Sequence, residues 1–441
     1  MVMSDVFASK IDSTYIGITP ESMLLGQDYA NWRQLLFDPW IELAILLLVS
    51  TIAMSDFYRR FQRSIRSAPR LKSLKLKSPR LKASDKPEAL PTISVVNPAY
   101  NESVNITDCM NAVLNSQLPD EVVLELIVAD DESTDETFSL ASAVADQDDC
   151  ATVFTVLPRP KDKSWKGKNW ACHCAKDKAT GEYILFIDAD VRLKEQAIAR
   201  ALTEAQTQKS DLLSCAPAIV CGCFSEWLVQ PLMANLIAVG FDFEGVNDPA
   251  QPEVAIAAGP FMLFRRKAYD KKGGHQAEAD NPVEALALAA LIKASGLSLR
   301  YVLGLDAASV RMYRSFDDLW EGWTKNYHLG SNRNIALTTV SAAAVFLIFV
   351  MPWAGLTASV IGTISHTIEG NLAVGLLGLS VIAVSLQIAL RQRSAKTIGQ
   401  PLRYLWLGWM GGGIVSAIAL TSIIKTETGW GWTWRGRSLT N

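Results

Sequence analysis

The chain has 441 residues, of which 49% are hydrophobic, so it can bury a sizeable core and more than one structural unit. Its 42 lysines and arginines nearly balance 45 aspartates and glutamates, so the net charge of −3 points to no partner until the charges are located along the chain. The seven cysteines are not spaced like the paired ligands of structural zinc sites, and we interpret them as reduced thiols.

The N-terminal part predicts a membrane anchor. Residues 1–39 contain acidic residues and lack a basic n-region, which argues against a cleaved signal peptide and favours a non-cytoplasmic segment. The apolar segment 40–58 approaches the ~20 residues that span a bilayer. The juxtamembrane linker 59–90 follows, and it has no acidic residue from Arg59 to Lys82. Such a run can bind nucleic acid, but directly after an apolar segment it is better explained as a positive-inside flank, so we expect no nucleic-acid partner.

Residues 91–334 show the pattern of a globular α/β domain. Short apolar runs alternate with helical patterns, and the first four strands are expected at 92–96, 122–129, 151–157 and 183–187. This alternation predicts three layers with a mostly parallel sheet. Polar residues follow successive strands, and the carboxyl ends of parallel strands meet at one edge, where such folds place their ligand sites.

The fourth of these strands ends in two acidic residues, Asp188 and Asp190, with Ala189 between them. Side chains two positions apart on a strand point the same way, so both carboxylates should face one crevice. Hard divalent cations such as Mg²⁺ or Mn²⁺ take oxygen ligands of this kind and often complete their shell with substrate phosphates. An isolated Asp-x-Asp is equally compatible with a solvated acidic turn.

Three further polar motifs precede this pair in the chain. They are Pro98-Ala99-Tyr100-Asn101-Glu102, Asp130-Asp131-Glu132-Ser133-Thr134-Asp135 and Gly167-Lys168-Asn169-Trp170-Ala171. Singly, each is explained by a helix cap or a surface lysine. In this order, and together with Asp188-Ala189-Asp190, they closely resemble the motif series of family 2 glycosyltransferases, over about residues 91–326. The segment 258–275 resembles the acceptor-side segment of the same family.

This resemblance implies an α/β, Rossmann-like nucleotide-diphosphosugar transferase fold of the GT-A type, combined with transmembrane helices. The donor nucleotide would be held by Pro98, Tyr100, Asn101, Glu102, Asp130, Asp131, Ser133, Lys168 and Asp188. The metal, Mg²⁺ or Mn²⁺, would be held by Asp188 and Asp190. The acceptor and diphosphate side would be formed by Gly259, Pro260, Phe261, His275, Trp320, Trp323 and Lys325. The last three residues are explained equally well by an amphipathic helix at the membrane interface.

One position departs from the family pattern. Relatives carry a Glu-Asp pair beyond the Gly-Gly segment, and its Asp acts as the general base. Here Glu284 matches the Glu, but Ala285 stands in place of the Asp. Glu284 or Asp280 could serve as the catalytic base, a substrate or water group could do so, or catalysis is lost. General-base catalysis contributes about 10²–10⁴-fold, so a less well placed carboxylate would leave a slow enzyme.

The C-terminal third predicts membrane helices. Residues 335–424 contain three apolar stretches, at 335–364, 371–390 and 402–424. The basic loop from Arg391 to Lys396 is typical of the cytoplasmic side. With the first anchor this gives about four spans and a cytoplasmic catalytic domain.

The side on which the tail lies stays open. A count of four spans places residues 425–441 on the non-cytoplasmic side of the membrane. The basic and aromatic stretch from Trp430 to Arg437 argues against that side. One apolar stretch that is re-entrant or doubled would resolve the conflict.

The sequence therefore predicts a membrane-bound inverting glycosyltransferase in a bacterial inner, plasma or thylakoid membrane. It would transfer a sugar from a nucleotide-diphosphosugar to a lipid hydroxyl. The segment Trp320-Glu321-Gly322-Trp323-Thr324-Lys325-Asn326 most closely resembles membrane glycosyltransferases of carotenoid and hopanoid pathways. A carotenoid or other isoprenoid is the expected acceptor, with a polyprenyl phosphate or polysaccharide as the alternative. The alternative from another functional class is a non-catalytic protein that binds the donor and partners an active transferase. Ala285 in place of the expected base motivates this alternative. A cation transporter is excluded, since the acidic pairs lie outside every apolar span.

Overall fold

A seven-stranded sheet forms the centre of the domain. The structure, a computed structural model, describes residues 38–74, 92–119, 122–160 and 164–439, so most of the expected N-terminal segment and of the linker lies outside the described residues. The strand order is β3-β2-β1-β4-β8-β6-β9. Its strands are β1 (Thr92–Ala99), β2 (Val123–Asp130), β3 (Ala151–Thr155), β4 (Tyr183–Ile187), β6 (Leu212–Ala216), β8 (Phe261–Arg265) and β9 (Leu299–Leu303). Every neighbouring pair is parallel except those made by β8, so the expected mostly parallel sheet is confirmed.

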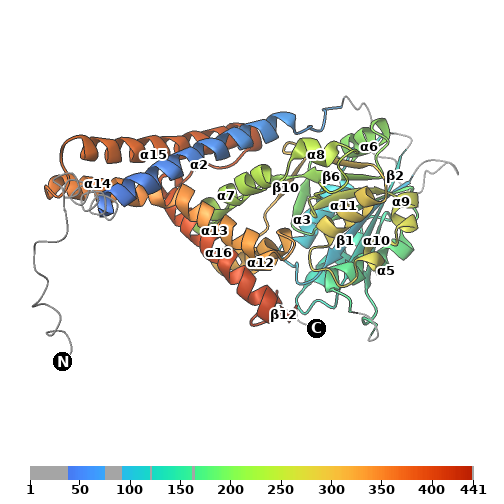
Figure 1. Cartoon of the computed structure of the whole chain (residues 1–441). Helices are drawn as coiled ribbons and strands as arrows, with labels where there is room; N and C mark the ends of the chain where they lie inside the picture. Colours follow the sequence, from blue (N-terminus) through green and yellow to red (C-terminus); the bar gives the residue numbers. More distant parts are fainter. Residues whose placement is uncertain (1–37, 75–91, 120–121, 161–163, 440–441) are drawn as a thin grey trace, which may run out of the picture.

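Alternating side chains of the buried strands feed two hydrophobic cores, one on each face of the sheet. On β4, Leu185 and Ile187 join the core that also contains residues of α3 (Ile106–Leu114) and α6 (Ala197–Thr207). Ile184 and Phe186 point to the other face, under α5 (Gly167–Lys178) and α11 (Glu284–Ala294). Helices therefore cover both faces of the sheet, as a parallel sheet requires (Figure 1).

Phe186 is the best test of this core. Its ring is 1% exposed and lies 5.3 Å from the ring of Tyr269 and 5.9 Å from that of Phe264. Phe186→Ala is expected to destabilise the domain by about 3–5 kcal/mol, because the side chain leaves a cavity that a packed core cannot close. Thermal unfolding of the full chain in detergent measures this. Phe138→Ala is the matched control, since Phe138 is 40% exposed, and equal shifts for both variants would contradict the expectation.

The most apolar helices lie to one side of the sheet (Figure 1). They are α2 (Pro39–Ser67), α13 (Ile335–Phe349), α14 (Met351–Ile364), α15 (Gly370–Ile398) and α16 (Gly408–Thr428). Within the described residues, three helical segments are long and apolar enough to cross a membrane, at 39–67, 370–398 and 405–428. The pair α13 and α14 becomes a fourth if it is taken as one span bent by 40°. Apolar side chains such as Ile45, Leu48 and Val374 are exposed on these helices, which fits contact with lipid.

The bend between α13 and α14 falls at Pro352. This residue lies in the first turn of α14, where a missing backbone N–H costs nothing, whereas it could not continue α13 without losing a hydrogen bond and clashing with the preceding turn. The expected single stretch 335–364 is therefore two helices.

Helix α16 begins and ends beside the domain. Just before it, the ring of Tyr404 lies 5.1 Å from that of Phe224, at the start of α7 (Phe224–Gly240). Near its end, Ser422 donates to the carbonyl of Thr324 and accepts from the backbone N–H of His328, both on α12 (Phe316–Gly330). The chain then forms a C-terminal hairpin of β11 (Thr433–Trp434) and β12 (Arg437–Ser438). Glu321 of α12 binds Thr433 and the backbone of Arg435, so the C-terminal hairpin lies against the domain.

Candidate active site

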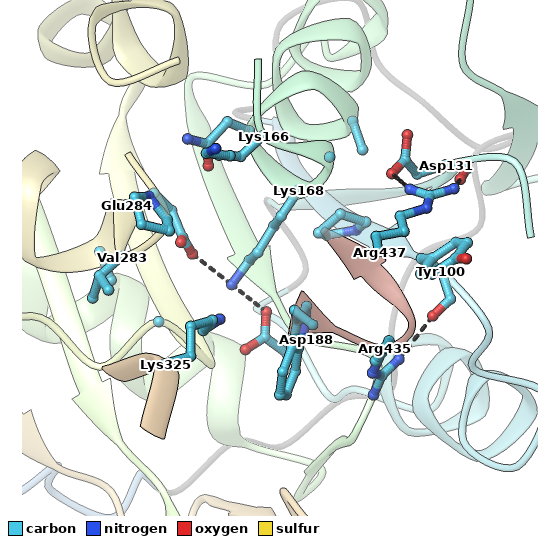
Figure 2. A pocket seen from close by; sticks show the side chains of 18 of the residues that line it. Tyr100, Asp131, Lys166, Lys168, Asp188, Val283, Glu284, Lys325, Arg435 and Arg437 are labelled. Carbon is cyan, nitrogen blue, oxygen red and sulfur yellow. Dashed lines mark hydrogen bonds and ion pairs between the residues drawn. The ribbon is translucent and has the colours of Figure 1, made fainter. Parts of the chain in front are cut away.

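A cavity of about 480 Å³ opens at the carboxyl ends of β1 and β4, within the range of ligand-binding pockets. Its wall combines the turns after these strands, the first residues of α5 and α11, one face of α12 and the C-terminal hairpin (Figure 2). Predicted site residues on the wall are Pro98, Tyr100, Glu102, Asp131, Lys168, Asp188, Asp190, Gly259, Pro260, Glu284 and Lys325. Segments widely separated in sequence thus meet at the edge where the α/β pattern places a ligand.

Three of the predicted donor residues instead join the two loops that form this edge. The Oδ1 atom of Asn101 accepts from the backbone N–H of Thr134 at 2.8 Å, and the backbone N–H of Asn101 donates to Ser133 at 2.9 Å. Asp130 accepts from the backbone N–H of Ser133 at 3.1 Å. Asn101 has φ of 52°, a left-handed conformation that asparagine tolerates better than most residues. Asn101, Asp130 and Ser133 therefore shape the loops without lining the cavity.

Asp131 is surrounded by arginines. Its carboxylate pairs with Arg159 at 3.1 Å and with Arg437 of the C-terminal hairpin. Burial raises the pKa of Asp131, although both arginines oppose this shift. Neither arginine was foreseen from the sequence: Arg159 lies in a loop without a motif, and Arg437 lies 306 residues from its partner.

Lys168 connects two carboxylates across the cavity (Figure 2). Its Nζ atom lies 2.6 Å from Asp188 Oδ1 and 2.6 Å from Glu284 Oε1. Burial would lower the pKa of Lys168, but the two carboxylates outweigh it and raise the pKa well above its ordinary value. Burial alone would likewise raise the pKa of Glu284, yet Lys168 holds it below the usual range of a glutamate. Lys168 and Glu284 are therefore both charged at neutral pH.

Asp190 has the environment of a carboxylate that fits a cation. Its Oδ1 atom is buried without a hydrogen-bond partner among the described residues. Burial first, then the neighbouring Asp188 and Glu102, raises its pKa to about 8. A divalent cation would satisfy the orphaned oxygen and relieve the repulsion between the two aspartates. In the described part of the chain, no group of three His, Cys, Asp or Glu residues forms a complete metal cage, so phosphate oxygens would have to complete the shell.

The two candidate bases lie in different places. Glu284 begins α11, is 7% exposed and lines the cavity. Asp280 is exposed in the preceding turn and does not line it. Ala285 is buried on the cavity wall beside Glu284, where its methyl group carries no proton-accepting atom.

Four residues predicted for the acceptor side do not line the cavity: Phe261, His275, Trp320 and Trp323. Phe261 starts β8 and is fully buried. His275 is buried 2.6 Å from the hydroxyl of Tyr269, and burial lowers its pKa to about 3, so it is neutral. Trp323 donates from Nε1 to Gln230 at 3.0 Å. The aromatic side of this segment therefore packs within the protein.

Lys325 follows Trp323 by two residues on α12, and its side chain does line the cavity. Burial lowers the pKa of Lys325 to about 8, although Glu284 partly opposes this. Its Nζ atom lies 4.3 Å from the ring centroid of Trp434, which belongs to the C-terminal hairpin. The hairpin also lines the cavity, and the sequence did not predict this position for it. Its basic and aromatic residues were noticed, but nothing in the sequence pairs them with loops at the other end of the chain.

Comparison with known proteins shows which proteins this chain resembles. Residues 94–273 match the family model described as glycosyl transferase family 2. Within this range the chain therefore resembles family 2 glycosyltransferases, and the matches indicate that it is a glycosyltransferase. With the observed sheet, this confirms the expected α/β fold class of the GT-A type.

Particular relatives include the 4,4'-diaponeurosporenoate glycosyltransferases of Staphylococcus aureus strains MRSA252 and USA300. Each is 29% identical over 274 residues, covering 61% of this chain and 68% of the relative. Among solved structures, the mannosyltransferase PcManGT from Pyrobaculum calidifontis, in complex with GDP-Man and Mn²⁺, is 18% identical with a TM-score of 0.45. The match covers 87% of this chain and 99% of that one. Glucosyl-3-phosphoglycerate synthase from Mycobacterium tuberculosis is 22% identical with a TM-score of 0.34, covering 52% and 75%.

Proposed function

We propose that the protein is a membrane-bound inverting glycosyltransferase that moves a sugar from a nucleotide-diphosphosugar to the hydroxyl of a lipid. The observation that carries this proposal is the ion-paired row Asp188–Lys168–Glu284. It brings a metal-binding carboxylate, a cation and a buried ionised carboxylate to the wall of one cavity. Those are the groups that transfer from a diphosphate to a hydroxyl requires.

The donor would occupy the half of the cavity formed by the turns after β1, β2 and β4. Tyr100, Glu102 and Asp131 line this half of the cavity and are the residues proposed to lie around the nucleoside. Asp188 and Asp190 would hold Mg²⁺ or Mn²⁺, and the cation would neutralise charge on the diphosphate.

Glu284 is the general base in this proposal. Its ionised carboxylate takes the proton of the acceptor hydroxyl, whose oxygen forms a bond to the anomeric carbon. The bond from that carbon to the donor phosphate breaks at the same time, and the nucleoside diphosphate leaves with the electron pair. Lys168 and Lys325 lie on the same wall and stabilise the negative charge that develops. The lowered pKa of Glu284 makes it a weaker base than one near neutrality, which favours a slow enzyme.

The acceptor is proposed to be a carotenoid or another isoprenoid alcohol. Two observations support the apolar class of this acceptor: apolar side chains are exposed on the helices beside the domain, and the Staphylococcus relatives are named for diaponeurosporenoate, a carotenoid carboxylate. A lipid acceptor also explains why a domain that takes a soluble donor would be held at a membrane.

Deleting the gene and comparing extracted pigments and lipids by mass spectrometry tests the acceptor and the sugar together. We expect a hexose or deoxyhexose increment to disappear from an isoprenoid. A loss confined to polyprenyl phosphates or to polysaccharide would overturn the acceptor class. Unchanged lipids and polysaccharides, together with no turnover by the purified full chain, would leave only a donor-binding protein.

The variant Ala285→Asp tests whether Glu284 already serves as the base. Because the existing carboxylate is buried, ionised and on the cavity wall, we expect kcat to change by less than about tenfold. Turnover by the full chain in detergent measures this. Ala285→Asn is the matched control for the added volume. Activity that appears only in Ala285→Asp would contradict the role of Glu284.

A further inference from the structure

The C-terminal hairpin is fixed to the domain by Glu321, a residue of α12. Glu321 accepts from the hydroxyl of Thr433 at 2.5 Å and from the backbone N–H of Arg435 at 3.0 Å. The Lys325 ammonium over the ring of Trp434 adds a second contact. The hairpin is therefore attached in one orientation, with its tip at the donor half of the cavity (Figure 2).

Arg435, at this tip, lies among the donor-side groups. Its Nη1 atom lies 2.5 Å from Glu102 Oε1 and 2.7 Å from the carbonyl oxygen of Tyr100. These contacts use one nitrogen, so Nε and Nη2 make no hydrogen bond to the described residues, although the guanidinium lies within the electrostatic reach of Asp188 and Asp190. A guanidinium presents a planar fork of donors that matches two phosphate oxygens at once.

Arg437 attaches the hairpin to the nucleoside side. Its guanidinium lies 3.4 Å from the ring centroid of Tyr100, contacts the carboxylate of Asp131 and donates to the carbonyl of Asp131 at 2.7 Å. Arg435, in the turn between β11 and β12, and Arg437, the first residue of β12, thus meet the loops that follow β1 and β2.

Charge explains why the cavity needs this contribution. Lys168, the cation predicted for the donor side, is shared by two carboxylates, and Asp131 and Glu102 add further negative charge. Arg159, Lys166 and Lys325 also line the cavity, but together with Lys168 they are outnumbered by its carboxylates Glu102, Asp131, Asp188, Asp190 and Glu284. A diphosphate entering such a wall is stabilised by additional cations, even with one divalent ion bound. Arg435 and Arg437 supply them from the tail.

We propose that the C-terminal hairpin is part of the donor site, with Arg435 binding the diphosphate of the donor, Arg437 locking the hairpin onto the nucleoside loops and Glu321 positioning both. This inference rests on the proposed function and deepens it. The hairpin is a binding element, so its removal weakens donor binding; a plug that merely filled the cavity would have the opposite effect.

The test measures calorimetric binding of UDP and of GDP, each with Mn²⁺, to the full chain in detergent. Arg435→Ala is expected to lower the affinity for whichever nucleotide binds more tightly by about tenfold or more, because a charge-assisted hydrogen bond to phosphate is lost. Arg435→Lys should recover part of the affinity. Glu321→Gln keeps both arginines but loosens the hairpin, so it should weaken binding with the thermal unfolding midpoint unchanged. Trp430→Ala and Arg59→Ala are matched controls, because both residues are exposed and outside the cavity.

A chain that ends at residue 429 lacks the hairpin, and its nucleotide affinity shows whether the hairpin strengthens or weakens donor binding. Weaker binding supports a donor-site hairpin, whereas unchanged or tighter binding overturns it and indicates a plug. Unchanged affinity in Arg435→Ala also overturns it. If the wild-type chain binds neither nucleotide, the proposed function itself fails, and that result is distinguishable because it does not depend on any variant.

Discussion

Asp188→Asn is expected to lower kcat by about 10³-fold or more, with loss of the Mn²⁺-dependent part of nucleoside diphosphate binding. A bound divalent ion contributes several kcal/mol of charge stabilisation at the leaving group, and each 1.36 kcal/mol is tenfold in rate. Asp188 lines the cavity and is paired with Lys168, while Asp190 beside it has an orphaned buried oxygen. Turnover of the full chain and calorimetry with Mn²⁺ plus UDP or GDP measure the two effects.

Asp190→Asn should give the same result, because the two carboxylates act as one site. Asp270→Asn is the matched control, since Asp270 is a surface residue paired with Lys176 and Arg266 and lies outside the cavity. Full Mn²⁺-dependent binding in either site variant would remove the metal from the proposal.

Glu284→Gln is expected to lower kcat by about 10²–10⁴-fold while the affinity for the nucleotide changes far less. The amide keeps the shape of the side chain but cannot accept the proton of the acceptor hydroxyl. Its carboxylate lies on the cavity wall, ionised by the neighbouring Lys168. Steady-state turnover separates kcat from KM for the donor.

Asp280→Asn is the control for this experiment, and the position of Asp280 predicts its effect on kcat. Asp280 is exposed and off the cavity wall, so its variant should retain kcat within a few-fold. If Asp280→Asn abolished turnover and Glu284→Gln did not, the base would be the residue that the structure places outside the cavity.

The sheet was predictable because its strands are short apolar runs bounded by polar turns. The expected strand 183–187 agrees with β4, and the two aspartates after it do lie on one cavity. The membrane helices followed from hydropathy alone. The break between α13 and α14 did not, because whether a proline bends or ends a helix depends on what packs around it.

A site residue was predictable only where its position in a strand or helix determines which way its side chain points. Lys168 and Glu284 begin helices at the sheet edge, so both reach the cavity. His275 and Trp323 have the chemistry of site residues, but their side chains pair with Tyr269 and Gln230 in the interior, which depends on tertiary packing. The contact of Arg437 with Asp131 spans 306 residues and leaves no local pattern.

Helix α16 delivers the hairpin to the cavity, and this has a practical consequence for anyone trimming the protein to obtain a soluble fragment. A piece limited to residues 91–334 would keep every strand of the sheet yet lose Arg435 and Arg437. Glu102 and Asp131 would then face solvent without their guanidinium partners. Crystals or inhibitor screens based on such a fragment would report on an altered pocket, more acidic than that of the intact chain.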